Sequence, residues 1–229
     1  MIITIDGPAG AGKSTVAKQL AATLGFDYLD TGAMYRAVAL CGIRKNVDWD
    51  KPAELVAIAE QMQICVETGR TFVDGEDVSD AVRSAEVTEK TRFAANNPAI
   101  RAIMVRWQQQ VAEEKNIVTE GRDQGTAVFP DAECKIYLTA TPEERARRRM
   151  SEFEQRGEKT DYGEILQQIN SRDASDMARE VGPLCEPPDA TRIVTNGMTI
   201  EQVVAKLVAL VESMRLLRKD GPQEQQPGT

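Results

Sequence analysis

Apolar positions follow two patterns along this chain, short continuous runs and a spacing of three or four residues, and the two patterns alternate several times. Short apolar runs predict buried strands at 2–6, 26–29, 117–120, 134–138 and 192–194. Apolar residues that recur every three or four positions predict helices over 14–24, 31–45, 52–62, 98–115, 142–156, 161–179 and from 200 onward. Strands that alternate with helices in this way are typical of an α/β protein, in which a parallel sheet carries helices on both faces.

Residues 63–97 break this alternation. Short apolar runs there are separated by glycine-containing turns, which predicts antiparallel strands joined by tight turns. After Leu217 the chain becomes rich in Gln, Pro and Gly, and this composition predicts a disordered tail. We therefore expect a core built from 1–62 and 98–217, a small β-rich insertion at 63–97 and a tail at 218–229.

Composition and charge narrow the class of protein. The 229 residues carry 28 basic and 36 acidic side chains, a net charge of −8, which argues against binding along a nucleic acid polymer. No segment is apolar over the length that a bilayer requires, and the N-terminus does not resemble a secretion signal. We therefore expect a cytoplasmic monomer with no membrane partner.

Cysteine and histidine usage excludes several kinds of site. Cys41, Cys65, Cys134 and Cys185 are scattered without C-x-x-C spacing, and three of them lie in apolar runs, so we expect buried free thiols and neither disulfides nor a zinc site. The chain contains no histidine. Its absence excludes histidine-activated nucleophiles and histidine metal ligands.

The strand at 2–6 runs into a G-x-x-x-x-G-K-S loop at 7–14, and a helical segment follows. Backbone N–H groups of such a loop cradle phosphate oxygens, Lys13 supplies a positive charge, and the Ser14 hydroxyl can bind Mg²⁺. The strand before the loop and the helix after it are the context that this motif requires. We therefore expect a nucleotide triphosphate to be bound by Gly7, Pro8, Ala9, Gly10, Ala11, Gly12, Lys13, Ser14 and Thr15.

A phosphate loop alone does not separate a switch GTPase, a motor ATPase and a small-molecule kinase. The run D-T-G-A-M-Y-R at 30–36 follows the second strand, at the edge where such sheets bind ligands. In a kinase, Arg36 would hold an acceptor phosphate. Taken alone, Arg36 is more often a solvated helix charge. A GTPase would need an N-K-x-D motif, which this sequence lacks.

A second charged cluster follows the strand at 117–120. Glu120 ends that strand, where a carboxylate can order the water molecules around Mg²⁺. Gly121 lets the chain approach a ligand, and Arg122 and Asp123 would extend into the cleft. An ion pair between Arg122 and Asp123 is an equally good explanation of the same residues.

A third cluster places Arg172, Asp176 and Arg179 at i, i+4 and i+7, on one face of the helix expected at 161–179. Such a stripe is more often a solvated surface than a site. However, the helix follows an arginine-rich run at 145–149 and a break at Gly157. This helix-loop-helix, with a lid at about 150–180, would close over ATP, with Arg148 among the residues that bind it.

Five motifs, taken in order, make the chain closely resemble the bacterial cytidylate kinases, the CMP/dCMP-specific nucleoside monophosphate kinases. They are I-T-I-D-G-P-A-G-A-G-K-S, L-D-T-G-A-M-Y-R, V-D-G-E-D-V-S-D-A-V-R, the G-R-D-x-G-T-x-V-F-P-D-A run at 121–132, and R-D-x-x-D-x-x-R at 172–179. The resemblance covers nearly all of residues 1–215. It implies a five-stranded parallel core, a monophosphate-binding insertion at 63–97 for CMP, and a mobile lid.

The resemblance also implies roles for individual residues. The CMP phosphate and sugar region would be held by Thr31, Arg36, Arg122 and Arg179. Arg172 and Asp176 would lie near the ribose and the transferred phosphate. Cytosine would be read by Arg101 and Asp123, with Thr91 as the hydroxyl that contacts the base. Ser14 and Glu120 would serve Mg²⁺, and the catalytic groups would be Lys13, Arg122, Arg172 and Arg179.

The sequence departs from the family pattern at three places. Glu120 stands where many relatives have Asp, and this longer side chain could shift the water contacts to the metal. One extra residue precedes Pro98, which makes the alignment of the base-contacting hydroxyl ambiguous. Ser175 and Met177 replace residues that are often basic, which lowers the charge of the lid.

The expected reaction is ATP + CMP → ADP + CDP, with dCMP also accepted, by direct in-line transfer with Mg²⁺. A phosphate acceptor has its second pKa near 6 and needs no general base, so the lack of histidine does not oppose this reaction. Two alternatives stay open: a kinase for UMP, AMP or shikimate, and a regulatory module that hydrolyses ATP slowly.

Overall fold

A computed structural model describes residues 1–67, 69–155 and 157–219. Its helices and strands follow one another as β1 (Ile2–Asp6), α1 (Lys13–Leu24), β2 (Asp27–Asp30), α2 (Thr31–Arg44), α3 (Pro52–Gln61), β3 (Ile64–Glu67), β4 (Arg70–Val73), β5 (Glu76–Asp77), η1 (Ala81–Arg83), α4 (Ala85–Ala95), α5 (Pro98–Ala112), β6 (Ile117–Gly121), η2 (Gln124–Val128), β7 (Cys134–Thr139), α6 (Pro142–Gln155), α7 (Tyr162–Met177), β8 (Thr191–Val194) and α8 (Ile200–Lys219). The expected tail is wrong at residues 218 and 219, which belong to α8, and the rest of it lies outside the described residues.

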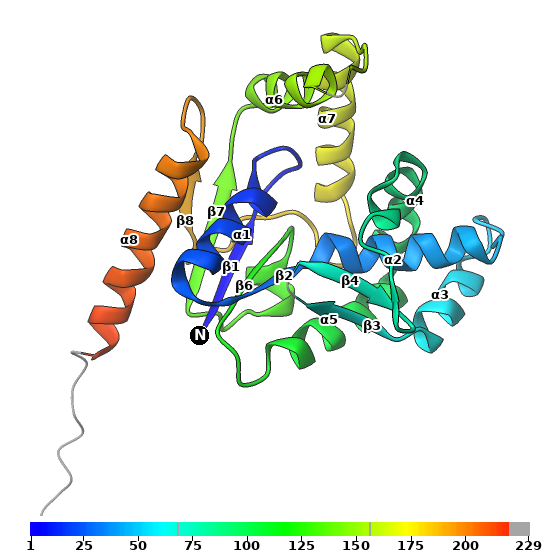
Figure 1. Ribbon diagram of the computed structural model, residues 1–229, viewed down its shortest axis with the longest axis horizontal. Helices are drawn as coiled ribbons and strands as arrows, with labels where there is room; N and C mark the ends of the chain where they lie inside the picture. Colours follow the sequence, from blue (N-terminus) through cyan, green and yellow to red (C-terminus); the bar gives the residue numbers. More distant parts are fainter. Residues whose placement is uncertain (68, 156, 220–229) are drawn as a thin grey trace, which may run out of the picture.

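The core is a five-stranded sheet in the order β2-β6-β1-β7-β8, with every neighbouring pair parallel. This confirms the five-stranded α/β fold. Asp6 at the end of β1 is in register with Gly121 at the end of β6, so the phosphate loop and the Glu120 cluster leave the sheet side by side. Figure 1 shows α8 at one end of the molecule, with α2, α3 and α4 grouped with the smaller sheet at the other.

Side chains of the central strand β1 alternate between the two faces of the sheet, because successive residues of a strand point to opposite sides. Ile3 and Ile5 are fully buried in an apolar cluster with α1 and α8. Thr4 and Asp6 point to the other face, where the π-helical turn η2 packs against them. A second apolar cluster on that face joins α2, α3, α4 and α5.

The insertion is β-rich only in its first half. Strands β3, β4 and β5 form an antiparallel sheet, as the turn pattern predicts, and the connecting turns use Gly69 at φ 77° and Gly75 at φ 82°. The second half is helical, because it contains η1 and α4. Ser84 caps α4 by accepting a hydrogen bond from the Val87 backbone N–H at 3.3 Å. The expectation of β structure up to residue 97 is therefore wrong for this half.

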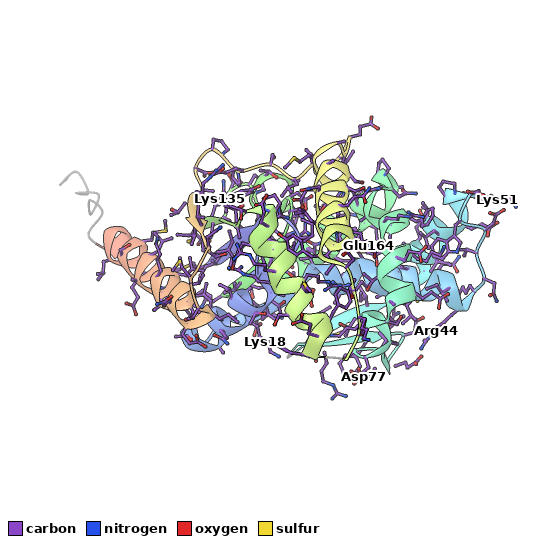
Figure 2. The ribbon with its side chains drawn as sticks, turned by 90° about the horizontal axis from the view of Figure 1, so that it is seen from above. Lys18, Arg44, Lys51, Asp77, Lys135 and Glu164 are labelled. Atoms are coloured by element: carbon purple, nitrogen blue, oxygen red, sulfur yellow. The ribbon has the colours of Figure 1, made fainter. Side chains whose placement is uncertain are left out.

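Helices α6 and α7 form a hairpin with a small apolar core of its own, built from Ala146, Ile165 and Ile169. Figure 2, which views the molecule from above, shows this hairpin lying over the sheet between α8 and α4. Helix α7 ends at Met177, two residues before Arg179. The Asp176 carbonyl accepts from the Leu184 N–H at 2.8 Å, so the chain turns away there and does not continue the helix.

The four cysteines are free, as expected, but only two are buried. Cys41 and Cys134 lie in the interior, whereas Cys65 and Cys185 are exposed. Cys65 lies on β3, a strand whose residues are mostly solvent-facing, so an apolar run there did not mean full burial. No helix among the described residues is long and apolar enough to cross a membrane.

Replacement of Leu207 by alanine in α8 is expected to lower the free energy of unfolding by about 2–5 kcal/mol, because a fully buried side chain would leave a cavity. Leu216→Ala in the same helix is the matched control. Leu216 is 62% exposed, and its loss should change stability by less than about 0.5 kcal/mol. Urea unfolding of both variants measures the difference, and equal effects would contradict the packing of α8 against the sheet.

Candidate active site

A cleft of about 690 Å³ opens where the parallel strands end, between the phosphate loop, α2, α4, α7 and the start of α8. Its volume lies within the usual range for a ligand site. Among the described residues, nine basic and four acidic side chains line it, so the cleft is positive in a chain of net charge −8. The basic residues are Lys13, Arg36, Arg83, Arg101, Arg122, Arg148, Arg149, Arg172 and Arg179.

The phosphate loop has the backbone that its sequence requires. Gly7 adopts φ 149°, and a Cβ there would lie 2.0 Å from the Leu138 carbonyl oxygen, so no other residue fits beside β7. Gly12 at φ 89° precedes α1, which begins at Lys13. The Lys13 ammonium donates to the Pro8 carbonyl at 2.9 Å. Burial, and then repulsion from Arg122, lowers the pKa of Lys13 to about 7.

Glu120 and Ser14 contact each other at the floor of the cleft, where their side-chain oxygens could bind a metal ion together. The Ser14 hydroxyl donates to the Glu120 carboxylate at 2.7 Å, and the Thr31 hydroxyl donates to the Glu120 carbonyl at 2.6 Å. The described residues contain no cluster of three or more His, Cys, Asp or Glu side chains that could hold a metal. The available set of one carboxylate and one hydroxyl suits Mg²⁺, which keeps several waters and binds substrate phosphates.

Asp176 holds two arginines of the cleft. The Arg122 Nε donates to one carboxylate oxygen at 2.8 Å, and Arg179 forms an ion pair with the other oxygen. Burial alone would raise the pKa of Asp176, but these two guanidiniums outweigh it and hold the pKa below its usual range. Arg179 also donates to the Asn96 side chain at 2.9 Å, which connects the end of α7 to the end of α4. Arg122, Asp176 and Arg179 therefore meet although Arg179 lies beyond the helix.

Two other arginines of the cleft have no protein partner. Arg36 and Arg172 make no hydrogen bond or ion pair with any described residue. Burial, and then repulsion from Arg122, lowers the pKa of Arg172 to about 10. Asp30 attracts Arg36 and Asp176 attracts Arg172, but neither carboxylate forms a hydrogen bond or close ion pair with them, so this group of cations still favours an anion.

Arg101 and Asp123 form an ion pair at the inner end of the cleft, and their side chains are only 3% and 6% exposed. Arg101 also donates to the Ala95 carbonyl at 3.0 Å, and its guanidinium lies 5.4 Å from the centre of the Tyr35 ring. Its Nε is buried without a hydrogen-bond partner. The alternative ion pair between Arg122 and Asp123 is wrong, because Arg122 pairs with Asp176.

Two threonines of α4 face the cleft. Thr91 donates its hydroxyl hydrogen to the Val87 carbonyl at 2.6 Å, and Thr88 donates to the Ser84 carbonyl at 2.9 Å. Each oxygen keeps lone pairs that can accept a hydrogen bond. Both positions are therefore compatible with a hydroxyl contact to a ligand, and the expected Thr91 lies on the cleft wall.

Arg145 and Asp173 do not line the cleft but support the phosphate loop beside it, and the sequence did not single them out. Arg145 Nη1 donates to the Ala9 carbonyl of the phosphate loop at 3.0 Å and lies 2.6 Å from the Asp173 carboxylate of α7. Its Nε donates to the Ala140 carbonyl at 3.0 Å. The only sequence signal was an arginine-rich run, and the packing of α6 decides which of those arginines faces inward.

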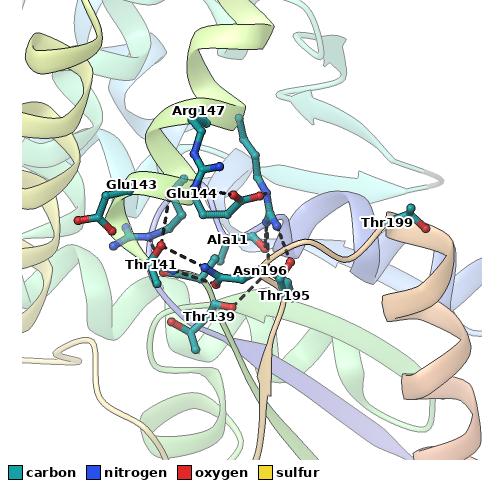
Figure 3. Close-up of polar contacts among 12 residues, drawn as sticks. Ala11, Thr139, Thr141, Glu143, Glu144, Arg147, Thr195, Asn196 and Thr199 are labelled. Atoms are coloured by element: carbon teal, nitrogen blue, oxygen red, sulfur yellow. Dashed lines mark hydrogen bonds and ion pairs between the residues drawn. The ribbon is translucent and has the colours of Figure 1, made fainter.

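Arg148, expected at the ATP site, connects the phosphate loop to the loop after β8. It donates to the Thr195 carbonyl at 2.6 Å, to the Thr195 hydroxyl at 3.0 Å and to the Ala11 carbonyl at 3.4 Å. Figure 3 shows Thr195 and Asn196 beside Thr141, with the Asn196 amide donating to the Thr141 hydroxyl at 3.1 Å. The sequence did not predict that this side of the cleft is lined by Met198, Thr199, Ile200 and Val203.

Comparisons of the sequence with known protein families and curated relatives point to one family. A family model described as cytidylate kinase matches residues 3–213. The chain is 46% identical to the cytidylate kinase of Rhodopirellula baltica, over 92% of each chain, and 46% identical to that of Caldanaerobacter subterraneus, over 90% of this chain and 92% of that one. The solved shikimate kinase of Bacteroides thetaiotaomicron aligns over 93% of this chain and 98% of that one, with 16% identity and a TM-score of 0.45.

Replacement of Arg145 by methionine is expected to lower the free energy of unfolding by about 3–5 kcal/mol, because it leaves the buried Asp173 carboxylate without its counter-ion. Arg147→Met in the same helix is the control. The Arg147 side chain is 66% exposed, and its ion pair with Glu144 should contribute less than about 1 kcal/mol. Guanidinium unfolding compares the two variants, and similar midpoints would show that Arg145 does not support the hairpin.

Proposed function

The chain belongs to the cytidylate kinase family, and we propose that it phosphorylates CMP and dCMP with ATP as donor, by direct in-line transfer. Family membership makes it a kinase, a phosphotransferase. The observation that carries the proposal is the continuity of the cleft. It runs from the phosphate loop, past a group of arginines, to the buried pair of Arg101 and Asp123.

The donor would lie on the phosphate loop. The backbone N–H groups of residues 9–15 and the Lys13 ammonium suit the phosphates of ATP, and Arg148 lies at the same side of the cleft. The Glu120 carboxylate and the Ser14 hydroxyl, in contact at 2.7 Å, would hold Mg²⁺. When bound, Mg²⁺ supplies positive charge that offsets the charge of the phosphates.

The acceptor phosphate would lie among Arg36, Arg122, Arg172 and Arg179, with the Thr31 hydroxyl beside them. Asp176 orients Arg122 and Arg179, whereas Arg36 and Arg172 are free to bind an anion. An acceptor phosphate is largely ionised at neutral pH and can attack without a general base. The chain's task is therefore to hold two phosphate groups in line and to neutralise their repulsion, with Lys13, Arg122, Arg172 and Arg179 as the catalytic groups.

The base would be read at the inner end of the cleft by Asp123, Arg101 and the Thr91 hydroxyl. Cytosine donates hydrogen bonds from N4, whereas uracil accepts at O4. An ionised Asp only accepts, so it pairs with cytosine and repels uracil. The Arg101 Nε, which is buried and has no hydrogen-bond partner among the described residues, is a donor that such a ligand would satisfy.

We also propose that the enzyme works in the cytoplasm as a monomer and has no nucleic acid polymer or membrane as a partner. Its four cysteines are free, which suits a reducing compartment.

The proposal is tested by a coupled assay of ADP formation with CMP, dCMP, UMP and AMP as acceptors at fixed ATP and Mg²⁺. We expect ADP release that depends on CMP or dCMP, with CDP or dCDP as the second product. A slow ATPase would instead release ADP at the same rate without any acceptor. A preference for AMP or UMP would assign the cleft to another monophosphate.

Replacement of Lys13 by alanine is expected to lower kcat by roughly three orders of magnitude, because a charge that stabilises the transferring phosphoryl group is lost. Lys18→Ala is the matched control, because Lys18 lies on the exposed face of α1 (Figure 2). Steady-state kinetics on folded protein measure both. A Lys13→Ala enzyme within about fivefold of the parent would remove Lys13 from the mechanism.

Replacement of Asp123 by asparagine should lower the ratio of kcat/KM for CMP over UMP by about 100-fold, mainly through loss of CMP activity. An amide both donates and accepts, so it no longer distinguishes N4 from O4. Asp131→Asn is the control, because Asp131 is exposed and follows in the same loop region. If the ratio stays at the parent value, Asp123 has only the structural role of pairing with Arg101.

A further inference from the structure

Asp6 is a fully buried carboxylate that no step of the proposed reaction uses. It ends β1 and points to the face of the sheet opposite Ile3 and Ile5. One of its oxygens accepts from the Gln124 N–H at 2.8 Å, and the other accepts from the Gly125 N–H at 2.7 Å. Both oxygens are therefore committed to the first two N–H groups of η2.

The helical turn η2 would ordinarily be capped by the residue immediately before it. Asp123 occupies the N-cap position, and its carbonyl accepts from the Ala127 N–H at 2.8 Å and the Val128 N–H at 3.2 Å. An aspartate at an N-cap normally turns its side chain back onto the first free N–H groups. The Asp123 side chain makes no such bond and points instead to Arg101 in the cleft.

We propose that Asp6 caps η2 in place of Asp123 and is thereby a positioning residue for base recognition. Because Asp6 satisfies the N–H groups of Gln124 and Gly125, the Asp123 carboxylate is free to face the cleft. This inference rests on the proposed role of Asp123 in reading cytosine.

The packing around Gly125 allows η2 to approach Asp6 closely. A Cβ on Gly125 would lie 2.9 Å from the Thr4 hydroxyl and 3.3 Å from an Asp6 oxygen, so a side chain there would push the turn away from β1. Gln124 holds the turn from the other side, because its side chain accepts from Thr119 at 2.8 Å and donates to Gln108 at 3.0 Å. The turn therefore keeps anchors of its own when Asp6 is changed.

Burial disfavours a charged side chain at position 6, so packing alone does not explain why this residue is an aspartate. Burial raises the pKa of Asp6 to about 6, even though its two backbone hydrogen bonds lower it, and the nearby Asp123 adds to the rise. A neutral side chain would avoid this desolvation. A carboxylate, however, offers a separate oxygen to each of the two N–H groups, so each hydrogen bond has its own acceptor.

The test is Asp6→Asn, which has nearly the same shape but a single acceptor oxygen. One N–H would then face an amide NH₂, and the Asp123 carboxylate would become the better cap. We expect the CMP/UMP ratio of kcat/KM to fall at least tenfold, through a higher KM for CMP, while KM for ATP stays within threefold. A ratio within twofold of the parent would overturn the inference.

Thr4→Val is the matched control, because Thr4 is the neighbouring buried polar residue on the same face of β1. In the part of the chain that the structure describes, its hydroxyl has no hydrogen-bond partner. Its CMP/UMP ratio should stay within twofold of the parent. A fall as large as that of Asp6→Asn would show that any change on this face disturbs the pocket, and would overturn the specific role of Asp6.

A double variant separates this inference from the proposed function. If Asp6 acts through Asp123, then Asp6→Asn in an Asp123→Asn background changes the CMP/UMP ratio no further. An additional tenfold loss would overturn the inference and leave the role of Asp123 intact. An unchanged ratio in Asp123→Asn alone would instead remove the premise about base recognition.

A measurement on the parent protein covers the case in which Asp6→Asn does not fold. Nuclear magnetic resonance can detect scalar coupling across hydrogen bonds between the backbone nitrogens of Gln124 and Gly125 and the Asp6 carboxyl carbon. Both couplings are expected. Their absence in a well-resolved spectrum of the parent would overturn the capping by Asp6.

Discussion

Repulsion between like charges is the constraint on which this structure depends. A kinase brings two anionic phosphate groups together, and their repulsion must be offset by cations held close to one another before the ligands arrive. The chain as a whole is acidic, yet its cleft concentrates basic side chains. The lowered pKa values of Lys13 and Arg172 show that burial and mutual repulsion act against these charges. A bound anion would offset the mutual repulsion of these cations, so the cleft favours phosphate.

Buried carboxylates keep these cations in place, and each one has a separate task. Asp176 orients Arg122 and Arg179, and Asp123 pairs with Arg101. A buried ion pair contributes little net stability, because desolvation offsets the attraction. Breaking one, however, leaves an uncompensated charge, so the geometry of the pairs is strongly enforced. The arrangement therefore supports placement of the guanidiniums more than it supports stability, and placement is what in-line transfer needs.

The sequence predicted the layers of the fold better than the contacts within the site. The alternation of strands and helices is a local pattern, and it predicted the parallel core. The G-x-x-x-x-G-K-S motif is also local, and it predicted the phosphate loop. Helix α4 was missed because its polar, mixed composition lacks a clear apolar stripe, although Ser84 is a good cap. The partners of Arg122 and Asp123 lie 54 and 22 residues away, so the local ion pair between these neighbours was only one of several possibilities. Which residues pair depends on how η2 and α7 pack, and no pattern of spacing carries that information.

The two halves of the site share one anchor in β1. Asp6 stands immediately before Gly7, the first residue of the phosphate loop, and its carboxylate reaches the turn that presents Asp123. The parallel register of Asp6 with Gly121 places both loops at the same edge of the sheet. A displacement at the end of β1 would therefore move the phosphate loop and the turn that follows Asp123 together. Because an error of about 1 Å in alignment can cost about 100-fold in rate, a common anchor at the buried end of β1 suits a reaction that needs two groups at a fixed separation.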